Sequence, residues 1–135
     1  MIAGTGIDLV DVRDFSRLLE DRASSFEQAT FGQEELAYCY SAASGVPERH
    51  LAARYAAKEA VVKALDQACS LAGITQARIP LICIELRRDR QGRPHVALRG
   101  EAHELAVRLG IDRTWVSVSH DGDMAMASVV MERLA

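Results

Sequence analysis

The longest regular pattern in the chain is a run of good helix formers over residues 50–65, HLAARYAAKEAVVKAL, which contains neither Gly nor Pro. Pro47 and Glu48 precede this run, at positions typical of the first turn of a helix. We expect the helix to continue a little beyond residue 65 and to end before Gly73. The pattern therefore predicts a central helix.

The charged side chains of this helix are not evenly distributed around it. At about 100° per residue, Glu59 and Lys63 share a face with Ala56, whereas Arg54 and Lys58 lie one turn apart on another side. The pattern alone leaves two interpretations open. Either the face is solvated and Glu59 pairs with Lys63, or it belongs to a binding site completed from elsewhere in the chain.

Residues 1–10 alternate as a β-strand does, with Gly4, Gly6 and Asp8 on one face. Glycine inside a strand costs stability and often marks a place where another backbone or a ligand approaches closely. Asp8 follows the two glycines on the same face, so it is a candidate ligand-binding carboxylate. By itself it also fits a helix N-cap or a solvated charge.

The remaining patterns predict shorter elements on both sides of the central helix. Helices are expected at 11–22, 32–43 and 100–109, a short irregular or helical connection at 24–30, and strands at 81–88, 95–99, 114–120 and 124–131. Asp121-Gly122 suits a two-residue type I′ hairpin turn. The expected fold class is α+β, a mostly antiparallel sheet packed against a long central helix and shorter helices, in one domain spanning residues 1–135.

The helix expected at 11–22 is amphipathic, with Arg13 and Arg17 one turn apart on its outer face. The apolar side chains expected to point inward are Val12, Phe15, Leu18 and Leu19. A basic outer face suits an acidic partner, but nearby acidic residues dilute its charge, so ordinary solubility explains it as well.

Composition narrows the class of protein. Hydrophobic residues make up 49% of the chain and charged residues 26%, which favours a soluble globular domain over disorder. The net charge of -3 argues against general nucleic-acid binding. No apolar run approaches the roughly 20 residues of a membrane span, and the first residues lack the basic start of a signal peptide. We therefore expect a cytoplasmic protein that binds neither nucleic acid nor membrane.

Cysteine spacing excludes two further classes. Cys39, Cys69 and Cys83 are odd in number, far apart and form no C-x-x-C pair. Neither a disulfide framework nor a zinc knuckle fits this spacing, so reduced thiols are expected.

Common catalytic motifs are absent. His120 ends the strand expected at 114–120, and alternation turns its side chain away from that of Ser119, which disfavours a Ser–His nucleophile pair. The chain has no nucleophile elbow, P-loop, G-x-G-x-x-G or H-E-x-x-H. What remains is two carboxylates, several cations and one strand-end histidine. This set suits Mg²⁺ together with a phosphorylated substrate.

Four segments in this order resemble the holo-acyl-carrier-protein synthases, the small type of 4′-phosphopantetheinyl transferase. They are Gly4-Thr-Gly-Ile-Asp-Leu-Val10, Arg54-Tyr-Ala-Ala-Lys-Glu-Ala-Val-Val-Lys-Ala-Leu65, Ile84-Glu-Leu followed by Gly92-Arg-Pro94, and Val116-Ser-Val-Ser-His120. Together the segments extend over nearly the whole chain. The A-A-K-E-A-x-x-K-A core of the second segment is the most specific of them.

The resemblance implies transfer of the phosphopantetheine arm of coenzyme A to a serine of an apo acyl carrier protein, with release of 3′,5′-ADP. The family uses Mg²⁺, and by motif Asp8 and Glu59 are its expected ligands. Lys63 is expected near the pyrophosphate, so Asp8, Glu59 and Lys63 form the expected catalytic set. The base that accepts the serine proton is expected to be Glu59, directly or through water, or else Lys63.

The resemblance also implies the contacts with substrate and partners. Arg54, Lys58 and His120, with Lys63, are expected to hold coenzyme A phosphates. The family implies a homotrimer with active sites between subunits, so that His120 comes from the chain next to the one that supplies Asp8 and Glu59. The outer face of the first helix is expected to dock the acidic carrier protein.

The sequence departs from the family pattern at two places, one in the helix expected at 11–22 and one at the end of the central helix. Arg13 and Arg17 are the expected carrier contacts on this face, but Asp14, rather than the family's arginine, precedes Phe15, and Arg13 is displaced by one position. Asp66-Gln-Ala-Cys69 stands where the family has a Gly-Thr-Gly turn. Two other functions stay open: a non-catalytic module that binds coenzyme A or a carrier protein, and a phosphohydrolase in which water replaces the serine.

Overall fold

The computed structural model describes residues 1–21 and 25–134. In chain order, its elements are β1 (Ile2–Asp11), α1 (Val12–Glu20), α2 (Phe26–Thr30), α3 (Gln33–Cys39), the 3₁₀ turn η1 (Ala42–Ser44), α4 (Pro47–Ala72), the 3₁₀ turn η2 (Leu81–Cys83), β2 (Ile84–Arg88), β3 (Pro94–Leu98), α5 (Gly100–Arg108), β4 (Arg113–Asp121) and β5 (Met124–Glu132). The expected α+β class is confirmed.

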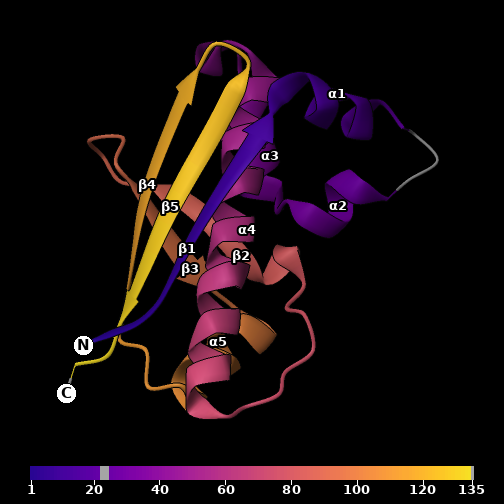
Figure 1. Ribbon diagram of the computed structural model, residues 1–135. Coiled ribbons are helices and arrows are strands. Elements are labelled where there is room, and N and C mark those ends of the chain that lie inside the picture. Colours follow the sequence, from indigo (N-terminus) through magenta and orange to yellow (C-terminus); the bar gives the residue numbers. More distant parts are fainter. Residues whose placement is uncertain (22–24, 135) are drawn as a thin grey trace.

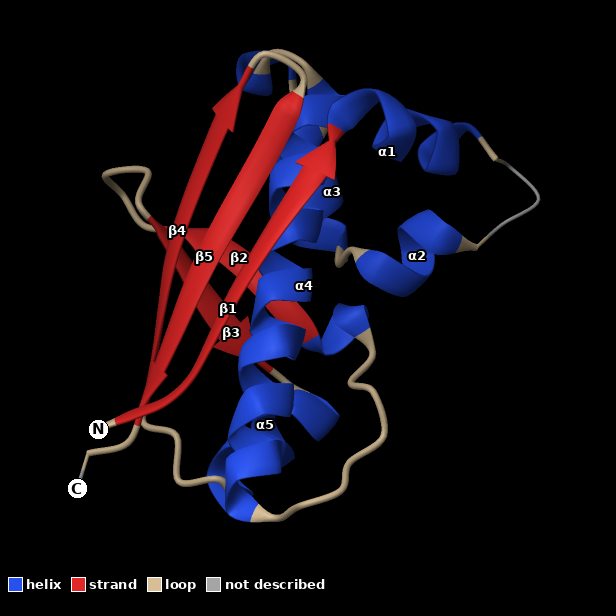
Figure 2. Cartoon of the chain, viewed as in Figure 1, coloured by secondary structure: helices blue, strands red, loops and turns tan. Residues whose placement is uncertain are grey.

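The strands form two antiparallel sheets. The larger sheet has the strand order β1-β5-β4, so the first strand of the chain pairs with the last, and β2 and β3 form a separate hairpin. The long helix α4 lies along one face of the larger sheet, and the two chain ends lie close together at one end of it (Figure 1). Helices α1 and α2 lie at the other side of α4 from β4 (Figure 2).

Close approach of two backbones explains the glycines of β1. A Cβ atom placed on Gly6 would lie 1.9 Å from the carbonyl oxygen of Ala60, and one on Gly4 would lie 2.2 Å from that of Ala64. Only glycine permits β1 to come so near to α4. The expectation that these glycines mark a close backbone is confirmed, and the contact fixes where Asp8 lies relative to α4.

The core has two parts along α4. Alanines of α4 pack with β1 and β5 in the larger part, together with Leu65, Ile84 and Met131. The smaller part contains Phe15 and Phe31, with the partly buried Phe26 and Tyr55 packed against them. This second part anchors α1 and α2 beside α4, so the first helix lies next to the central one.

The helix expected at 11–22 is shorter than predicted. It spans Val12–Glu20, because the Asp11 carboxylate caps it by accepting from the backbone N–H groups of Arg13 and Asp14. Leu18 was expected to point inward, but it is 48% exposed, and this expectation is wrong. A nine-residue helix offers a narrower buried stripe than the pattern assumed, and Phe15 is its buried residue. The end predicted at Arg22 lies outside the described residues.

Two other boundaries differ from the prediction. The helix expected at 32–43 ends at Cys39, with Gly32 as its N-cap. The last hairpin turns at Gly122-Asp123 rather than at Asp121-Gly122, because Asp121 still pairs with Met124. The three cysteines are free, as expected. No helix within the described ranges is both long and apolar enough to cross a membrane.

Candidate active site between β1 and α4

Two carboxylates that lie far apart in the sequence border one cavity. Asp8 near the end of β1 and Glu59 in the middle of α4 both line a cavity of about 550 Å³, together with Asp14 and Leu18 of α1. Their side chains are 17% and 15% exposed. The glycine contacts of β1 with α4 bring these acids together.

Each of the two carboxylates has a cation as its partner. The Lys63 ammonium donates to Asp8 Oδ1 at 3.1 Å and to the carbonyl oxygen of Ile7 at 2.9 Å. Nη2 of Arg78 donates to both oxygens of Glu59, at 2.6 and 2.8 Å. Lys63 therefore pairs with β1, and the interpretation of the face as a solvated Glu59–Lys63 pair is wrong.

Tyr55 lies one helical turn before Glu59 and borders the same cavity. Burial raises the pKa of its hydroxyl, and the neighbouring Glu59 and Asp8 carboxylates raise it further. The phenol therefore stays protonated beside the two acids and can donate a hydrogen bond. Tyr55 thus adds a hydroxyl to the carboxylates that line this cavity.

The donor set of this cavity suits one particular kind of ion. Within residues 1–21 and 25–134, no three His, Cys, Asp or Glu side chains gather as a metal cluster. Asp8 and Glu59 supply two carboxylates on one cavity. Mg²⁺ is commonly bound through one or two carboxylates and keeps several waters, so these residues fit it.

A second polar cluster lies beside β2 and α3. Arg54 is 3% exposed, its guanidinium lies 4.6 Å from the centre of the Tyr38 ring, and its Nε has no hydrogen-bond partner. Arg88 lies over the same ring at 5.2 Å, and both arginines line a cavity of about 250 Å³. A buried cation with an unsatisfied donor at a cavity is a good receptor for an anionic group.

His120 belongs to the same region. It lies one residue before the end of β4, opposite Ala125, and is exposed. Burial lowers the pKa of His50, and the positive charges of Arg54, Arg88 and His120 lower it further. His120 and Arg54 therefore both lie within electrostatic reach of His50.

Lys58 has a different environment from the other cations of α4. Its ammonium is fully buried and donates to Glu35 Oε1 at 2.7 Å and to the carbonyl oxygens of Leu81 and Ile84. Burial lowers its pKa, and the Glu35 carboxylate opposes that shift. These partners already use the three donors of the ammonium, so the expectation that Lys58 holds a coenzyme A phosphate needs correction.

The two polar clusters occupy different sides of α4. Nine residues separate Arg54 from Lys63, which at 100° per residue places them about 180° apart around the helix. Lys63 contacts β1, whereas Arg54 contacts Tyr38 of α3. The residues expected to bind phosphate are therefore divided between two sides of α4 within one chain.

Arg13 and Arg17 lie on α1, and their side chains are 75% and 78% exposed. Arg13 pairs with Asp123 of the last hairpin and Arg17 with Asp14. Both arginines are accessible to a partner, and α1 itself borders the cavity of Asp8 and Glu59.

Sequence reasoning missed two residues of the main cavity. Tyr55 was detectable, since it precedes Glu59 by four residues on the same predicted helix. Arg78 was not, because it lies in the 73–80 connection, where no periodicity places a side chain.

Comparison with known proteins identifies the family of the chain. The sequence model of the 4′-phosphopantetheinyl transferase superfamily matches residues 4–127. A holo-[acyl-carrier-protein] synthase of Geobacter sulfurreducens is 41% identical over 133 residues, which is 98% of this chain and 99% of the relative. One from Geobacter metallireducens is 40% identical over 134 residues, 99% and 100% of the two chains.

The fold is similar to solved structures as well. A complex of such a synthase with coenzyme A from Chronobacterium ammoniagenes superposes with a TM-score of 0.83 at 30% identity, over 98% of each chain. The family match covers both cavity carboxylates, and the similarity extends over the whole described fold. The chain belongs to the 4′-phosphopantetheinyl transferase superfamily, with relatives named holo-[acyl-carrier-protein] synthase.

Proposed function

We propose that this protein transfers the 4′-phosphopantetheine group of coenzyme A to a serine of an apo acyl carrier protein, giving the holo carrier protein and 3′,5′-ADP. The observation that carries the proposal is the pair Asp8 and Glu59 on one cavity, with Lys63 bound to Asp8. Family membership and relatives named holo-[acyl-carrier-protein] synthase support the same reaction.

Asp8 and Glu59 are the residues proposed to hold Mg²⁺. Bound there, the ion would offset the negative charge that develops on the transferred and leaving phosphates. Lys63 is held by two acceptors on β1 and would present its remaining donor to the pyrophosphate. Glu59 is the first candidate to accept the serine proton, because it borders the cavity beside α1, and Lys63 is the second.

Arg54 and His120 are proposed to bind coenzyme A phosphates. The unsatisfied Nε of Arg54, the guanidinium of Arg88 over the same Tyr38 ring and the exposed imidazole of His120 support this role. Because this group lies across α4 from Lys63, one coenzyme A would contact both sets most simply if they came from two subunits. This division supports the proposed homotrimer with active sites between subunits.

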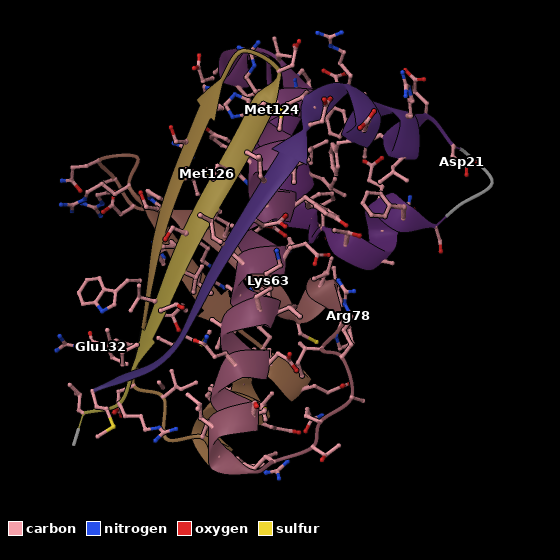
Figure 3. The ribbon with its side chains drawn as sticks, viewed as in Figure 1. Asp21, Lys63, Arg78, Met124, Met126 and Glu132 are labelled. Carbon is pink, nitrogen blue, oxygen red and sulfur yellow. The ribbon has the colours of Figure 1, made fainter. Side chains whose placement is uncertain are left out.

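The outer face of the larger sheet supports oligomerisation too. Ile7, Leu9, Trp115 and Met126 are 59%, 60%, 53% and 40% exposed on β1, β4 and β5. Leu9 pairs directly with Met126, so these two apolar side chains are neighbours on β1 and β5, and Trp115 pairs with Val130. An exposed apolar face of this kind commonly marks a protein–protein interface. Figure 3 labels Met126 on β5.

Met126→Lys tests the oligomer. A charge in the middle of this face should convert trimers to monomers and reduce turnover by at least about tenfold, because each site would lose the neighbour's phosphate-binding residues. Sedimentation velocity gives the mass, with Val107→Lys on α5, an exposed position on another element, as the matched control. A trimer that survives Met126→Lys unchanged would remove this face from the proposal.

The outer face of α1, with Arg13 and Arg17, is proposed to dock the carrier protein. It carries two exposed cations beside the cavity in which the acceptor serine would react. Complementary charge accelerates encounter and fixes orientation.

A cytoplasmic location remains the expectation from the sequence.

The deciding experiment is the intact mass of an apo acyl carrier protein after incubation with this protein, coenzyme A and Mg²⁺. Transfer would add about 340 Da, the mass of a phosphopantetheine group, and EDTA would abolish the gain. Coenzyme A binding without any gain on several carriers would favour the non-catalytic module. Release of 3′,5′-ADP without carrier modification would favour a hydrolase.

A further inference from the structure

Arg78 holds the Glu59 carboxylate by both of its oxygens. A single nitrogen, Nη2, donates to Oε1 at 2.6 Å and to Oε2 at 2.8 Å. Within the described ranges these are the hydrogen bonds that Arg78 makes. Figure 3 labels Arg78 in the connection after α4 and Lys63 on the helix itself.

The two partners of this ion pair differ in freedom. Glu59 is on the central helix and 15% exposed, whereas the Arg78 side chain is 64% exposed and its backbone lies in neither helix nor strand. The arginine can therefore leave the pair by side-chain rotation, while the carboxylate stays in place. An exposed cation in such a pair is held weakly.

The position of the pair makes its opening consequential. Glu59 and Arg78 line the 550 Å³ cavity of Asp8 and also a second cavity of about 430 Å³, which Lys63 borders. The guanidinium thus lies where the two cavities adjoin. A cation released at this point remains within the space that the reacting phosphates would enter.

The second acid–cation pair of the site behaves differently. Lys63 has an additional anchor, the carbonyl oxygen of Ile7 at 2.9 Å, and can stay when the oxygens of Asp8 gain another partner. Arg78 has no comparable anchor in the described part of the chain, and it covers both oxygens of Glu59. A divalent ion that binds Glu59 must therefore compete with Arg78.

We propose that Arg78 is an exchangeable counter-ion of Glu59. The Arg78 guanidinium neutralises the Glu59 carboxylate as long as no Mg²⁺ is bound. It would be released when Mg²⁺ binds Glu59, and would then bind the pyrophosphate oxygens of coenzyme A. A guanidinium is suited to both partners, because its planar donors match carboxylate and phosphate alike. The inference rests on the proposed function and adds a substrate-binding residue that no motif identified.

The proposal predicts effects of opposite sign for one substitution. Arg78→Gln should tighten Mn²⁺ binding roughly fivefold in the absence of coenzyme A, since a competitor is removed. With Mg²⁺ present, the same variant should bind coenzyme A roughly tenfold more weakly, because a charged phosphate contact is lost. A merely structural role would not produce this reversal. Arg78→Lys, which keeps the charge, should restore part of the coenzyme A affinity.

Mn²⁺ binding is measured by electron paramagnetic resonance and coenzyme A binding by calorimetry, on protein whose thermal unfolding matches wild type. Arg108→Gln is the control for loss of a nearby charge, because Arg108 contacts Gln76 at the rim of the second cavity and does not touch Glu59. It should change neither affinity by more than about twofold.

Glu59→Gln separates this proposal from the proposed function. If Glu59→Gln loses Mn²⁺ while Arg78→Gln binds it as wild type does, the exchange is overturned and the metal site stands. If Glu59→Gln binds Mn²⁺ as tightly as wild type, the metal assignment falls and the exchange falls with it. Equal tightening by Arg78→Gln and Arg108→Gln would also overturn the exchange, since net charge would then explain it.

Discussion

Lys58 and Lys63 lie five residues apart on one helix and have opposite environments. Lys58 is fully buried, and its ammonium is bound by Glu35 and two backbone carbonyl oxygens of the η2–β2 segment. Lys63 is 54% exposed and bridges Ile7 and Asp8 at the edge of the 430 Å³ cavity. Lys58 connects α4 to α3 and to the η2–β2 segment, whereas Lys63 borders the candidate active site.

The difference shows what decides the role of a charge on a helix. A buried ion pair must have all its donors satisfied, which leaves nothing for a ligand. A partly exposed pair costs little to open, so its members can exchange protein partners for an ion or a phosphate. The residue type and the motif are the same in both cases, and the packing around the side chain differs.

The largest effect should come from the acids on the Lys63 side. Asp8→Asn and Glu59→Gln each remove a negative charge without changing shape, and each should lower turnover by about 10³-fold. Thermal unfolding should change little, because both acids border a cavity. The measurement is carrier modification by mass against time. Asp66→Asn, on the second cavity, is the control and should keep nearly full turnover; full activity of both variants would contradict the metal assignment.

Lys58→Met tests the structural role of the buried lysine. It leaves the Glu35 carboxylate buried without its cation and should lower the free energy of unfolding by about 3 kcal/mol. Lys63→Met should cost less than about 1 kcal/mol while strongly reducing turnover. Urea unfolding measures the loss of stability in both variants.

Substitution of Glu35 should partly restore the stability that Lys58→Met loses. Lys58→Met combined with Glu35→Gln removes the stranded charge and should recover part of the lost stability, because the amide oxygen can accept from only one of the two backbone N–H groups, that of Gly32 at Oε1 or that of Leu86 at Oε2. If Lys58→Met is as stable as wild type, burial does not set its role, and the contrast with Lys63 fails.

Gly6→Ala tests the contact that places Asp8 beside α4. The added Cβ would lie 1.9 Å from the Ala60 carbonyl oxygen, and neither backbone can yield locally. We expect a loss of about 2 kcal/mol in stability and reduced turnover, because β1 must move away from Glu59. Thermal unfolding of Gly32→Ala, whose Cβ meets nothing closer than 3.9 Å, provides the control. Equal stability of the two variants would argue against the close approach.

The smallest effect is expected on α1. Arg13→Glu with Arg17→Glu should raise the KM for the carrier protein roughly tenfold and leave the KM for coenzyme A unchanged, since these residues border neither cavity. Steady-state kinetics with each substrate varied separates the two. Arg90→Glu in the β2–β3 turn is the matched control. An unchanged carrier KM would exclude the α1 face as the docking surface.

Much of the fold was predictable from the sequence. The central helix was expected from its composition and its Gly73 end, and the structure confirms it as Pro47–Ala72. The hairpins and the closeness of β1 to another backbone were predictable for similar local reasons, namely alternation and glycine content. The site was predictable in part, because Asp8, Glu59 and Lys63 belong to recognisable motifs, and the structure brings them to one place.

Other features depend on contacts that no local pattern encodes. Leu18 is exposed because the core-facing side of the nine-residue α1 is formed by Phe15 with the partly buried Val12 and Leu19. Lys58 is buried because Glu35 and the η2–β2 segment come to it from 23 or more residues away. Arg78 meets Glu59 from a connection without periodicity.

The sequence by itself determined the α+β class, the order of the elements and the family, because helix propensity, alternation and motif residues act over short ranges. Only the tertiary structure decided which charges are satisfied internally and which face a cavity, since burial depends on every element that packs around a side chain. That distinction separates Lys58 from Lys63, and it identifies Arg78 as the partner of Glu59.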